Sequence, residues 1–293
     1  NYSNNYIRLF DPSNYKYKRC KKCDIVNLDL IGNKPYITGR VKVDSLEVPV
    51  NLLIDSGSSD ALWLFENQEK GLIVKDKSFR DFLGAGLSGD VYGTRAKVKT
   101  FSIGKFTFQS PKVAYPDSLI IKKLKKNKKR DGSLGGEVLK RFNCVFDYPN
   151  SKILFKTNSF HKLPFRYNRS GLQVENEGVR LVMELNTEDC GGAVIVGKEN
   201  KTMGIQSVVK TNYRYVTKPA FAISVVRNDS PADLAGLNIG DVITYINGKS
   251  THDMTLKQVV GYFYKKIGTR ITLKVFRYGT ERSFSFKLES PIN

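Results

Sequence analysis

Residues 48–54 alternate apolar and polar positions, and the alternation ends at a carboxylate. This period of two predicts a strand with one buried face. The apolar positions of that face are Val48, Val50, Leu52 and Ile54. Asp55 follows directly, so its carboxylate starts in a poorly hydrated position and needs hydrogen bonds or a charged partner. Ser56 can supply a hydroxyl, and Gly57 lets the backbone turn closely around the carboxylate.

The strand, the turn and the apolar run after it resemble the active-site loop of the pepsin and retropepsin aspartic proteases. The matching residues are Leu53-Ile54-Asp55-Ser56-Gly57-Ser58-Ser59, followed by Leu62-Trp63-Leu64. The resemblance implies that Asp55 is a catalytic carboxylate, with Ser56 and Gly57 supporting it. It also implies that two such aspartates share one proton and activate water against a peptide bond. Asp-Ser-Gly is by itself an ordinary turn tripeptide, so the interpretation depends on the rest of the chain.

A second group of elements further along the chain agrees with this resemblance. Leu134-Gly135 resembles the strand that closes a single retropepsin-like domain. We expect a helix from Glu137 to Phe142 after it, and then two strands, at 142–148 and 153–155. Ser133 stands where the family usually has an apolar residue, which predicts looser packing around the active-site loop.

The glycine-rich segment 83–93 predicts a hairpin that can bend. It lacks the Gly-Lys-Ser/Thr ending of a phosphate-binding loop, and no helical pattern follows it. In the aspartic proteases a mobile flap lies at this distance after the catalytic loop and covers the substrate. By resemblance, the candidate flap residues are Gly84, Gly86, Leu87, Gly89 and Val91. The alternative is a flexible connection between two strands.

The last eighty or so residues resemble a PDZ domain. Ser230-Pro231 predicts a capped short helix that ends at Gly236, and Asn247-Gly248 predicts a tight turn. We expect an amphipathic helix over 254–265 and a closing strand over 271–276. The resemblance implies a peptide-binding site at Phe221, Ala222 and Ile223.

Ala222 replaces a glycine that the PDZ family usually has in this place. This difference leaves capture of a terminal carboxylate open and keeps internal extended segments as candidate ligands. The alternative is a PDZ module that only packs on its neighbour.

These patterns predict a mainly β protein, with an acid-protease-like β-barrel domain followed by a C-terminal PDZ domain. We place the protease-like domain at 24–160 and the PDZ domain, with its connecting segment, at 161–293. Residues 1–23 are interpreted as the tail of a preceding lobe or as an N-terminal extension. Within them, Ile7 to Phe10 reads as a single strand.

Charge and cysteine content add few constraints. The formal net charge is +20, which attracts anions in general. The run from Lys122 to Arg130 reads as a solvated loop without the interleaved aromatic residues of single-strand binders, so no specific nucleic-acid partner is predicted. Cys20 and Cys23 have the spacing of half a zinc site, but no second pair follows. Free thiols or one local disulfide are favoured, and no metal or other cofactor is predicted.

Only Asp55 lies in a credible catalytic loop. Asp189-Cys190-Gly191 lacks a preceding strand, and Asp131-Gly132-Ser133 has the wrong order. The second aspartate would come from an identical chain or from another lobe of the same polypeptide, and we favour an upstream lobe.

The predicted function is therefore an aspartic endopeptidase, or one lobe of it, that acts on polypeptides. A catalytically inactive peptide-binding protein is the main alternative, and a basic nucleic-acid or membrane-surface binder is a third. No apolar run is long enough to span a membrane. The resemblance favours a secreted, periplasmic or cell-envelope location.

Overall fold

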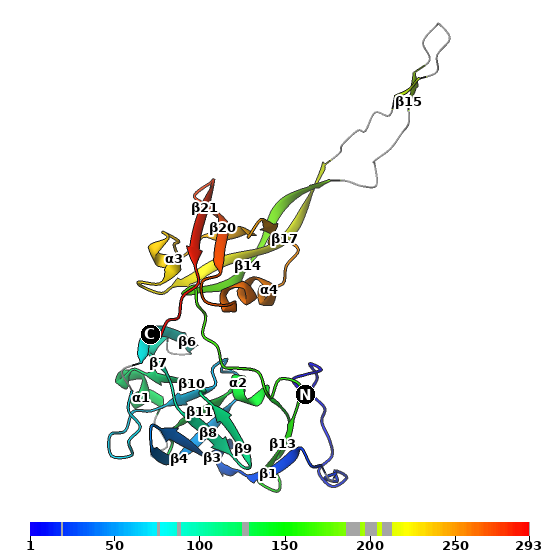
Figure 1. The fold of residues 1–293 in the computed structure, drawn as a ribbon. Coiled ribbons are helices and arrows are strands. Elements are labelled where there is room, and N and C mark those ends of the chain that lie inside the picture. The colour runs from blue at the N-terminus through cyan, green and yellow to red at the C-terminus, as the bar shows by residue number, and fades with distance from the viewer. Residues whose placement is uncertain are drawn as a thin grey trace. The chain divides into compact units, whose positions relative to one another are not determined.

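The computed structural model describes residues 1–18, 20–74, 77–86, 89–124, 129–185, 194–196, 204–206 and 213–292. The chain forms two compact units, one of residues 1–167 with the last residues from Ser290 onward, and one of Asn168–Glu289. Figure 1 shows the elements of the two units, and each unit has its own hydrophobic core.

The first unit contains a large sheet with the strand order β6-β7-β10-β5-β11-β4-β3-β8-β9, and β2 pairs with β3. A separate sheet has the order β1-β13-β12. The strands are β1 (Cys23–Asn27), β2 (Asp29–Ile31), β3 (Lys34–Val43), β4 (Leu46–Asp55), β5 (Leu62–Leu64), β6 (Ser78–Gly86), β7 (Gly89–Lys97), β8 (Thr100–Ile103), β9 (Phe106–Gln109), β10 (Lys112–Pro116), β11 (Gly132–Gly135), β12 (Phe142–Asp147) and β13 (Lys152–Thr157). The helices are α1 (Ser118–Leu124) and α2 (Gly136–Leu139).

The alternation that ends at Asp55 forms β4. Val48, Val50, Leu52 and Ile54 are at most 8% exposed and belong to the core of the first unit. The helix expected over 137–142 is the shorter α2, and the two strands expected after it are β12 and β13, which pair antiparallel. The predicted mainly β fold of this unit is confirmed.

The second unit has a sheet with the order β14-β17-β18-β20-β21, and β19 pairs with β18. Its strands are β14 (Leu172–Leu185), β17 (Tyr213–Val226), β18 (Val242–Ile246), β19 (Lys249–Ser250), β20 (Arg270–Arg277) and β21 (Thr280–Lys287). Its helices are α3 (Pro231–Leu234), α4 (Leu256–Gly261) and the 3-10 turn η2 (Tyr262–Tyr264). β15 (Val194–Val196) and β16 (Gly204–Gln206) pair with each other.

The local signals for helix starts and turns in the second unit are confirmed. The Ser230 hydroxyl accepts a hydrogen bond from the Asp233 amide at the start of α3. Thr255 and Gln258 form a capping box at α4. Asn247 and Gly248 both have positive φ, 49° and 77°, in the turn between β18 and β19. The closing strand predicted at 271–276 is β20, which is not the last strand of the sheet. The strand that closes the sheet is β21, which was not predicted and which pairs with β20.

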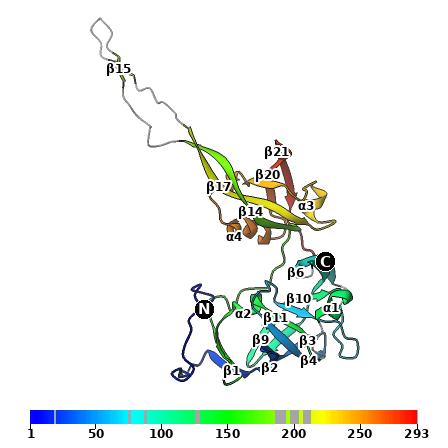
Figure 2. The same cartoon turned by 180° about the vertical axis from the view of Figure 1, so that it is seen from behind.

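β14 and β17 run beyond the rest of the second unit as a two-stranded ribbon (Figures 1 and 2). Register shifts at 173/174 and 176/179 separate the ribbon from the part of β14 that lies in the sheet. One face of the ribbon is apolar and exposed. It consists of Val179, Leu181, Met183, Leu185, Tyr213 and Tyr215, whose exposed fractions are 44–73%.

Two predictions near the basic and N-terminal segments are wrong. Ile7 to Phe10 forms no strand, and Ile7 and Leu9 are about nine-tenths exposed. Arg130 does not lie in a solvated loop but is only 9% exposed. Lys122 to Leu124 belong to α1, and residues 125–128 lie outside the described part of the chain.

Cys20 and Cys23 form a disulfide, which is one of the two states expected for them. Cys144 is free, and burial raises the pKa of its thiol to about 12. Across the described residues, no helix combines the length and apolar character needed to cross a membrane.

Candidate functional site

The strand β11 sets the position of Asp55, because it lies between β4, which leads into the Asp55 loop, and β5, which follows that loop. β11 pairs parallel with β4 and antiparallel with β5, so the loop after Asp55 passes around the end of β11. Gly135 lies opposite Asp55 in this register. The Gly136 amide donates to the Ser58 carbonyl at 2.7 Å, and the Glu137 amide donates to the Asp60 carbonyl at 3.1 Å. The start of α2 therefore holds the loop in place.

Backbone amides orient the Asp55 carboxylate. Its Oδ1 atom accepts hydrogen bonds from the amides of Gly57 at 3.1 Å and Ser58 at 3.3 Å. Both donors act on the same oxygen and so anchor one side of the carboxylate to its own loop. Asp55 is half-buried, while Ser56 and Gly57 are exposed. The arrangement presents one oriented carboxylate at the end of a buried strand.

A buried guanidinium lies near this carboxylate. Arg130 donates from Nε to the Gly132 carbonyl at 3.0 Å and from Nη2 to the Ser133 hydroxyl at 2.6 Å. Its guanidinium carbon lies 5.2 Å from the centre of the Phe65 ring. Burial lowers the pKa of Arg130, and the charges of Tyr36 and Asp55 act in the opposite direction. Ser133 is 3% exposed, and its hydroxyl accepts the hydrogen bond from Arg130. The looser packing expected around the active-site loop is therefore wrong.

An ion-pair network links the loop after Asp55 to the predicted flap. Arg95 of β7 lies 2.5 Å from Asp60 Oδ1 and 2.7 Å from Asp81 Oδ2. Trp63 Nε1 donates to the other Asp60 oxygen at 2.7 Å. Burial alone would lower the pKa of Arg95, but the two carboxylates outweigh it and raise that pKa. The base of the hairpin is therefore fixed to the loop by charge.

The predicted flap is the hairpin of β6 and β7. Gly84 and Gly89 have φ of 144° and 102°, which favours glycine at both positions. Val91 is only 8% exposed and packs with Leu83, Ala114 and Trp63. Gly86 is exposed, and Leu87 lies outside the described residues. The glycines thus lie near the hairpin's end, where Gly84 pairs with Val91, and Val91 belongs to a small apolar cluster.

Asp131 has a structural position in this unit. Its carboxylate accepts from Lys70 Nζ at 2.6 Å and from the Asn51 amide at 2.9 Å. The segment Asp189-Cys190-Gly191 lies outside the described residues. Within the part of the chain that the structure describes, Asp55 is the aspartate that ends a buried strand and accepts hydrogen bonds from the amides of Gly57 and Ser58.

Phe221, Ala222 and Ile223 are not open to a peptide. They are 1–3% exposed and lie in β17, which is bordered by β14 on one side and β18 on the other. A strand adds to a sheet only at a free edge, so the assignment of these three residues to a peptide groove is corrected. The sheet ends at β14, and α4 packs beside β14. The edge of β14 next to α4 is the place where a peptide can add.

The second unit contains a polar cluster of carboxylates and a histidine. Glu184, His252 and Asp253 lie close enough to share a cation. Lys218 already lies among them, at 2.7 Å from Glu184 and 3.0 Å from Asp253. Its ammonium group compensates one of the two carboxylate charges and already bridges both groups, and His252 Nε2 lies 2.9 Å from Asp253 Oδ2.

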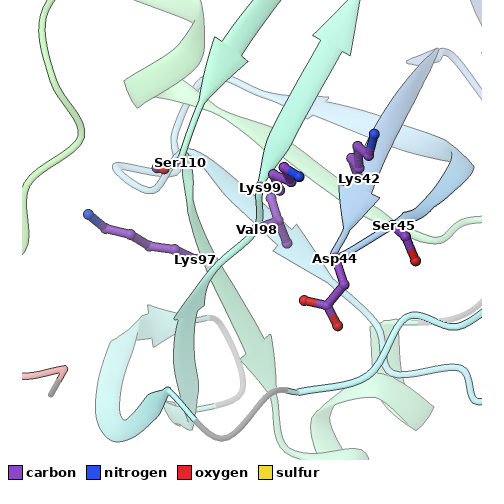
Figure 3. Close-up of a pocket in the computed structure, with 7 residues that line it drawn as sticks. All are labelled: Lys42, Asp44, Ser45, Lys97, Val98, Lys99 and Ser110. Carbon is purple, nitrogen blue, oxygen red and sulfur yellow. The ribbon is translucent and has the colours of Figure 1, made fainter.

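A basic pocket of about 600 Å³ lies in the first unit at the turns that join β3 to β4 and β7 to β8 (Figure 3). The pocket is lined by Lys42, Asp44, Ser45, Lys97, Val98, Lys99 and Ser110. It lies at the opposite end of β4 from Asp55, about 30 Å away along the strand. This pocket is therefore separate from the Asp55 loop.

Comparisons with known proteins agree with this geometry. Residues 39–138 match the family described as aspartyl protease, and residues 223–277 match the family described as PDZ domain. The combination defines an aspartyl-protease-type fold joined to a peptide-recognition fold. More particularly, the chain carries an aspartyl protease domain at 39–138 followed by a PDZ domain at 223–277.

Individual relatives are similar over limited stretches. A carboxy-terminal-processing protease of Bartonella bacilliformis is 31% identical over 86 residues, covering 29% of this chain and 18% of that protein. An HtrA-like serine protease of Staphylococcus aureus is 28% identical over 162 residues, covering 54% of this chain and 20% of that protein. The chain spans 15–20% of the length of the curated relatives it matches.

Among solved structures, a retropepsin-like aspartic protease from Rickettsia conorii is similar. It has 18% sequence identity and a TM-score of 0.32, and the match covers 45% of this chain and 98% of that one. The HtrA-type protease AlgW with a decapeptide is 12% identical with a TM-score of 0.30, and that match covers 92% of this chain and 80% of AlgW.

Sequence reasoning missed three residues around the Asp55 loop, namely Asp60, Arg95 and Arg130. Asp60 follows the Asp-Ser-Gly motif within one turn, and a carboxylate before a buried run indicates a charged partner. That signal could have predicted an ion pair, but not which arginine forms it. Arg95 and Arg130 are brought to the loop by strand pairings that no local pattern encodes.

Proposed function

We propose that the protein is an aspartic endopeptidase in which Asp55 is one of two catalytic carboxylates. The observation that carries this proposal is the Asp55 loop, where two amides hold one carboxylate oxygen at the end of a buried strand. A carboxylate held in this way can accept a proton from water and pass it on. The match of residues 39–138 to the aspartyl protease family supports the same reaction.

The mechanism needs a second, facing aspartate. Two carboxylates at close range share one proton, because like charges so near cannot both ionise. The ionised member takes a proton from water, and the protonated member donates to the carbonyl oxygen of the peptide bond. We infer that the facing aspartate comes from a second copy of this chain or from another lobe. Ser56 and Gly57 act by shaping the turn around Asp55.

The hairpin of β6 and β7 is the element that we assign to cover the substrate. Its glycine-rich end supports bending, while the Arg95–Asp60 ion pair keeps its base in register with the catalytic loop. The PDZ domain would bind polypeptide by addition of a strand at the edge of β14. Binding there would raise the local concentration of substrate near the protease domain.

The test is a peptidase assay of the protein and of Asp55→Asn on a mixed peptide library between pH 3 and 8. We expect the wild-type rate to follow a bell-shaped profile on the acidic side, set by the pair of aspartates, and we expect Asp55→Asn to abolish it. Asp29→Asn, at an exposed position of β2, is the matched control and should keep full activity. Undiminished cleavage by Asp55→Asn would contradict the proposal.

Sedimentation in parallel with the assay distinguishes the two sources of the facing aspartate. A dimer whose activity is lost in Asp55→Asn supports pairing of two copies. An inactive monomer that gains activity when the remainder of its polypeptide is supplied supports another lobe. If the protein binds peptides but neither arrangement cleaves them, it is a peptide-binding protein with an inactive protease-like domain.

A further inference from the structure

We propose that the PDZ domain binds internal extended segments of polypeptides and does not bind free carboxyl termini. The inference rests on the proposed peptide-binding role of the β14 edge. It concerns the loop of residues 168–171, which leads into that strand. Two backbone amides of this loop, those of Ser170 and Leu172, already donate to side chains of the loop itself.

The direction of the sheet defines where a terminal carboxylate would lie. All strand pairs described in this sheet are antiparallel. A peptide that adds antiparallel to β14 has its carboxyl end beside Leu172, where β14 begins. The loop before Leu172 therefore faces the end of the ligand. Capture of a carboxylate in such a loop requires backbone N–H groups that are free to donate.

Two amides of the loop instead donate within the chain. The Ser170 amide donates to Asn168 Oδ1 at 2.9 Å, and the Leu172 amide donates to the Ser170 hydroxyl at 3.0 Å. The Ser170 hydroxyl donates in turn to Asn168 Oδ1 at 2.8 Å. Ser170 has no exposed surface and Leu172 is 1% exposed. Asn168 and Ser170 thus fill the place of a ligand carboxylate from within the chain.

The surroundings keep the loop in this conformation. Asn168 Nδ2 also donates to the Leu172 carbonyl at 2.6 Å. The Ser170 carbonyl accepts from the Ala232 amide at 3.1 Å, which ties the loop to α3. Gly171 has a φ of 86°, and a Cβ at this position would lie 2.1 Å from the Ser230 hydroxyl. A terminal carboxylate would have to break several buried hydrogen bonds before it could bind.

An internal segment avoids this requirement. Its main chain pairs with the β14 edge through neutral N–H and C=O groups, and it continues past Leu172 without placing a charge in the loop. The ligand class that the structure favours is an extended stretch within a longer polypeptide. Such stretches are exposed in unfolded or partly unfolded chains.

The experiment uses the full chain and two synthetic libraries of acetylated heptapeptides. The libraries share the same sequences and differ only in a C-terminal amide or a free carboxylate. We expect the amide library to select ligands, and each selected sequence to bind no more than about threefold tighter as the free acid, measured by fluorescence anisotropy. Selection by the acid library alone, or a preference of about tenfold or more for the acid, would overturn the inference while leaving the peptide-binding role intact. Failure of both libraries to select ligands would overturn the peptide-binding role as well.

A double variant tests the cause. Asn168→Gly with Ser170→Ala removes the side chains that occupy the amides, so the free acids should gain affinity by about tenfold relative to the amides. Ser283→Ala, at an exposed position of β21 at the other edge of the sheet, is the control and should leave the ratio unchanged. An unchanged ratio in a folded double variant would contradict the role assigned to Asn168 and Ser170.

Discussion

Arg95 Nη1 lies 2.5 Å from Asp60 Oδ1, and both side chains are about one-tenth exposed. Arg95 belongs to β7 of the hairpin, and Asp60 belongs to the loop that begins at Asp55. The same guanidinium also pairs with Asp81 of β6. One arginine therefore connects both strands of the hairpin with the Asp55 loop, and its removal leaves two carboxylates in a poorly hydrated place.

The first prediction concerns this pairing. Arg95→Met should lower the free energy of unfolding by about 3–5 kcal/mol, because breaking a buried pair leaves uncompensated charge. Arg80→Met is the matched control, since the Arg80–Asp117 pair has side chains that are 64% and 39% exposed. Its cost should be about 1 kcal/mol or less. Urea denaturation at neutral pH measures both, and equal losses in the two variants would contradict the assignment.

Ser133 gives a second prediction. Ser133→Ala removes the acceptor of Arg130 Nη2 in a buried place, so the free energy of unfolding should fall by about 1–3 kcal/mol. Ser102→Ala, which loses a partly exposed hydrogen bond to Thr107, should cost about 0.5 kcal/mol or less. Thermal unfolding of the two variants is the measurement. A stabilised Ser133→Ala would show that Arg130 finds another acceptor.

The third prediction concerns the space at Gly135. A Cβ there would lie 2.2 Å from the Asp60 carbonyl oxygen, so Gly135→Ala must push the Asp55 loop away from α2. Displacement of a catalytic group by about 1 Å costs on the order of 100-fold in rate, and we expect a loss of at least that size. Gly261→Ala in α4 has no heavy atom within 4 Å of the added Cβ and should remain folded and active. Peptidase rates and circular dichroism together separate lost geometry from lost folding.

His161 makes stability depend on pH. Its ring lies 5.3–5.6 Å from the rings of Phe106, Phe108 and Phe142. Burial, and then the charges of Arg141 and Lys162, lower the pKa of His161 from its usual 6.5. The unfolded chain therefore binds a proton first as pH falls through about 6.5, and stability decreases from there until the folded pKa is reached.

The variant His161→Gln should lose this part of the pH dependence. Urea midpoints at pH 7.5 and 5.5 measure it, and the wild-type midpoint should fall more between these two values than the variant midpoint. Equal decreases would show that His161 is not the group responsible. The comparison is informative for an acid protease, because the expected acidic optimum lies where this contribution is lost.

The sequence predicted those parts of the fold that local patterns encode. The strand at 48–54 was found because alternation directly reports which face is buried, α3 was found from its capping residue Ser230, and α4 was found from its amphipathic pattern. Phe221 to Ile223 were misplaced because the assignment rested on resemblance to an apolar-Gly-apolar loop of PDZ domains, and that short pattern does not report which strand forms the edge of the sheet. Their position follows from pairing with β14 and β18, which is set by long-range contacts.

The run of basic residues at 122–130 also led to a wrong prediction. Arg130 ends a run of lysines, and only the pairing of β11 with β4 and β5 carries its side chain into the interior. The same pairing places the Ser133 hydroxyl where it accepts a hydrogen bond from Arg130. The Asp55 loop itself could be predicted because its motif is contiguous, whereas the Arg95–Asp60 pair spans 35 residues of sequence.

The apolar face of the β14–β17 ribbon has a consequence for colloidal behaviour. A net charge of +20 favours repulsion between molecules and high solubility at low salt. Added salt screens that repulsion within a few ångströms, while sulfate strengthens attraction between apolar surfaces. The exposed side chains of Leu181 and Tyr215 should then dominate. Ammonium sulfate should precipitate the protein early and increase its retention on a phenyl resin, and Leu181→Ser with Tyr215→Ser should reverse both effects.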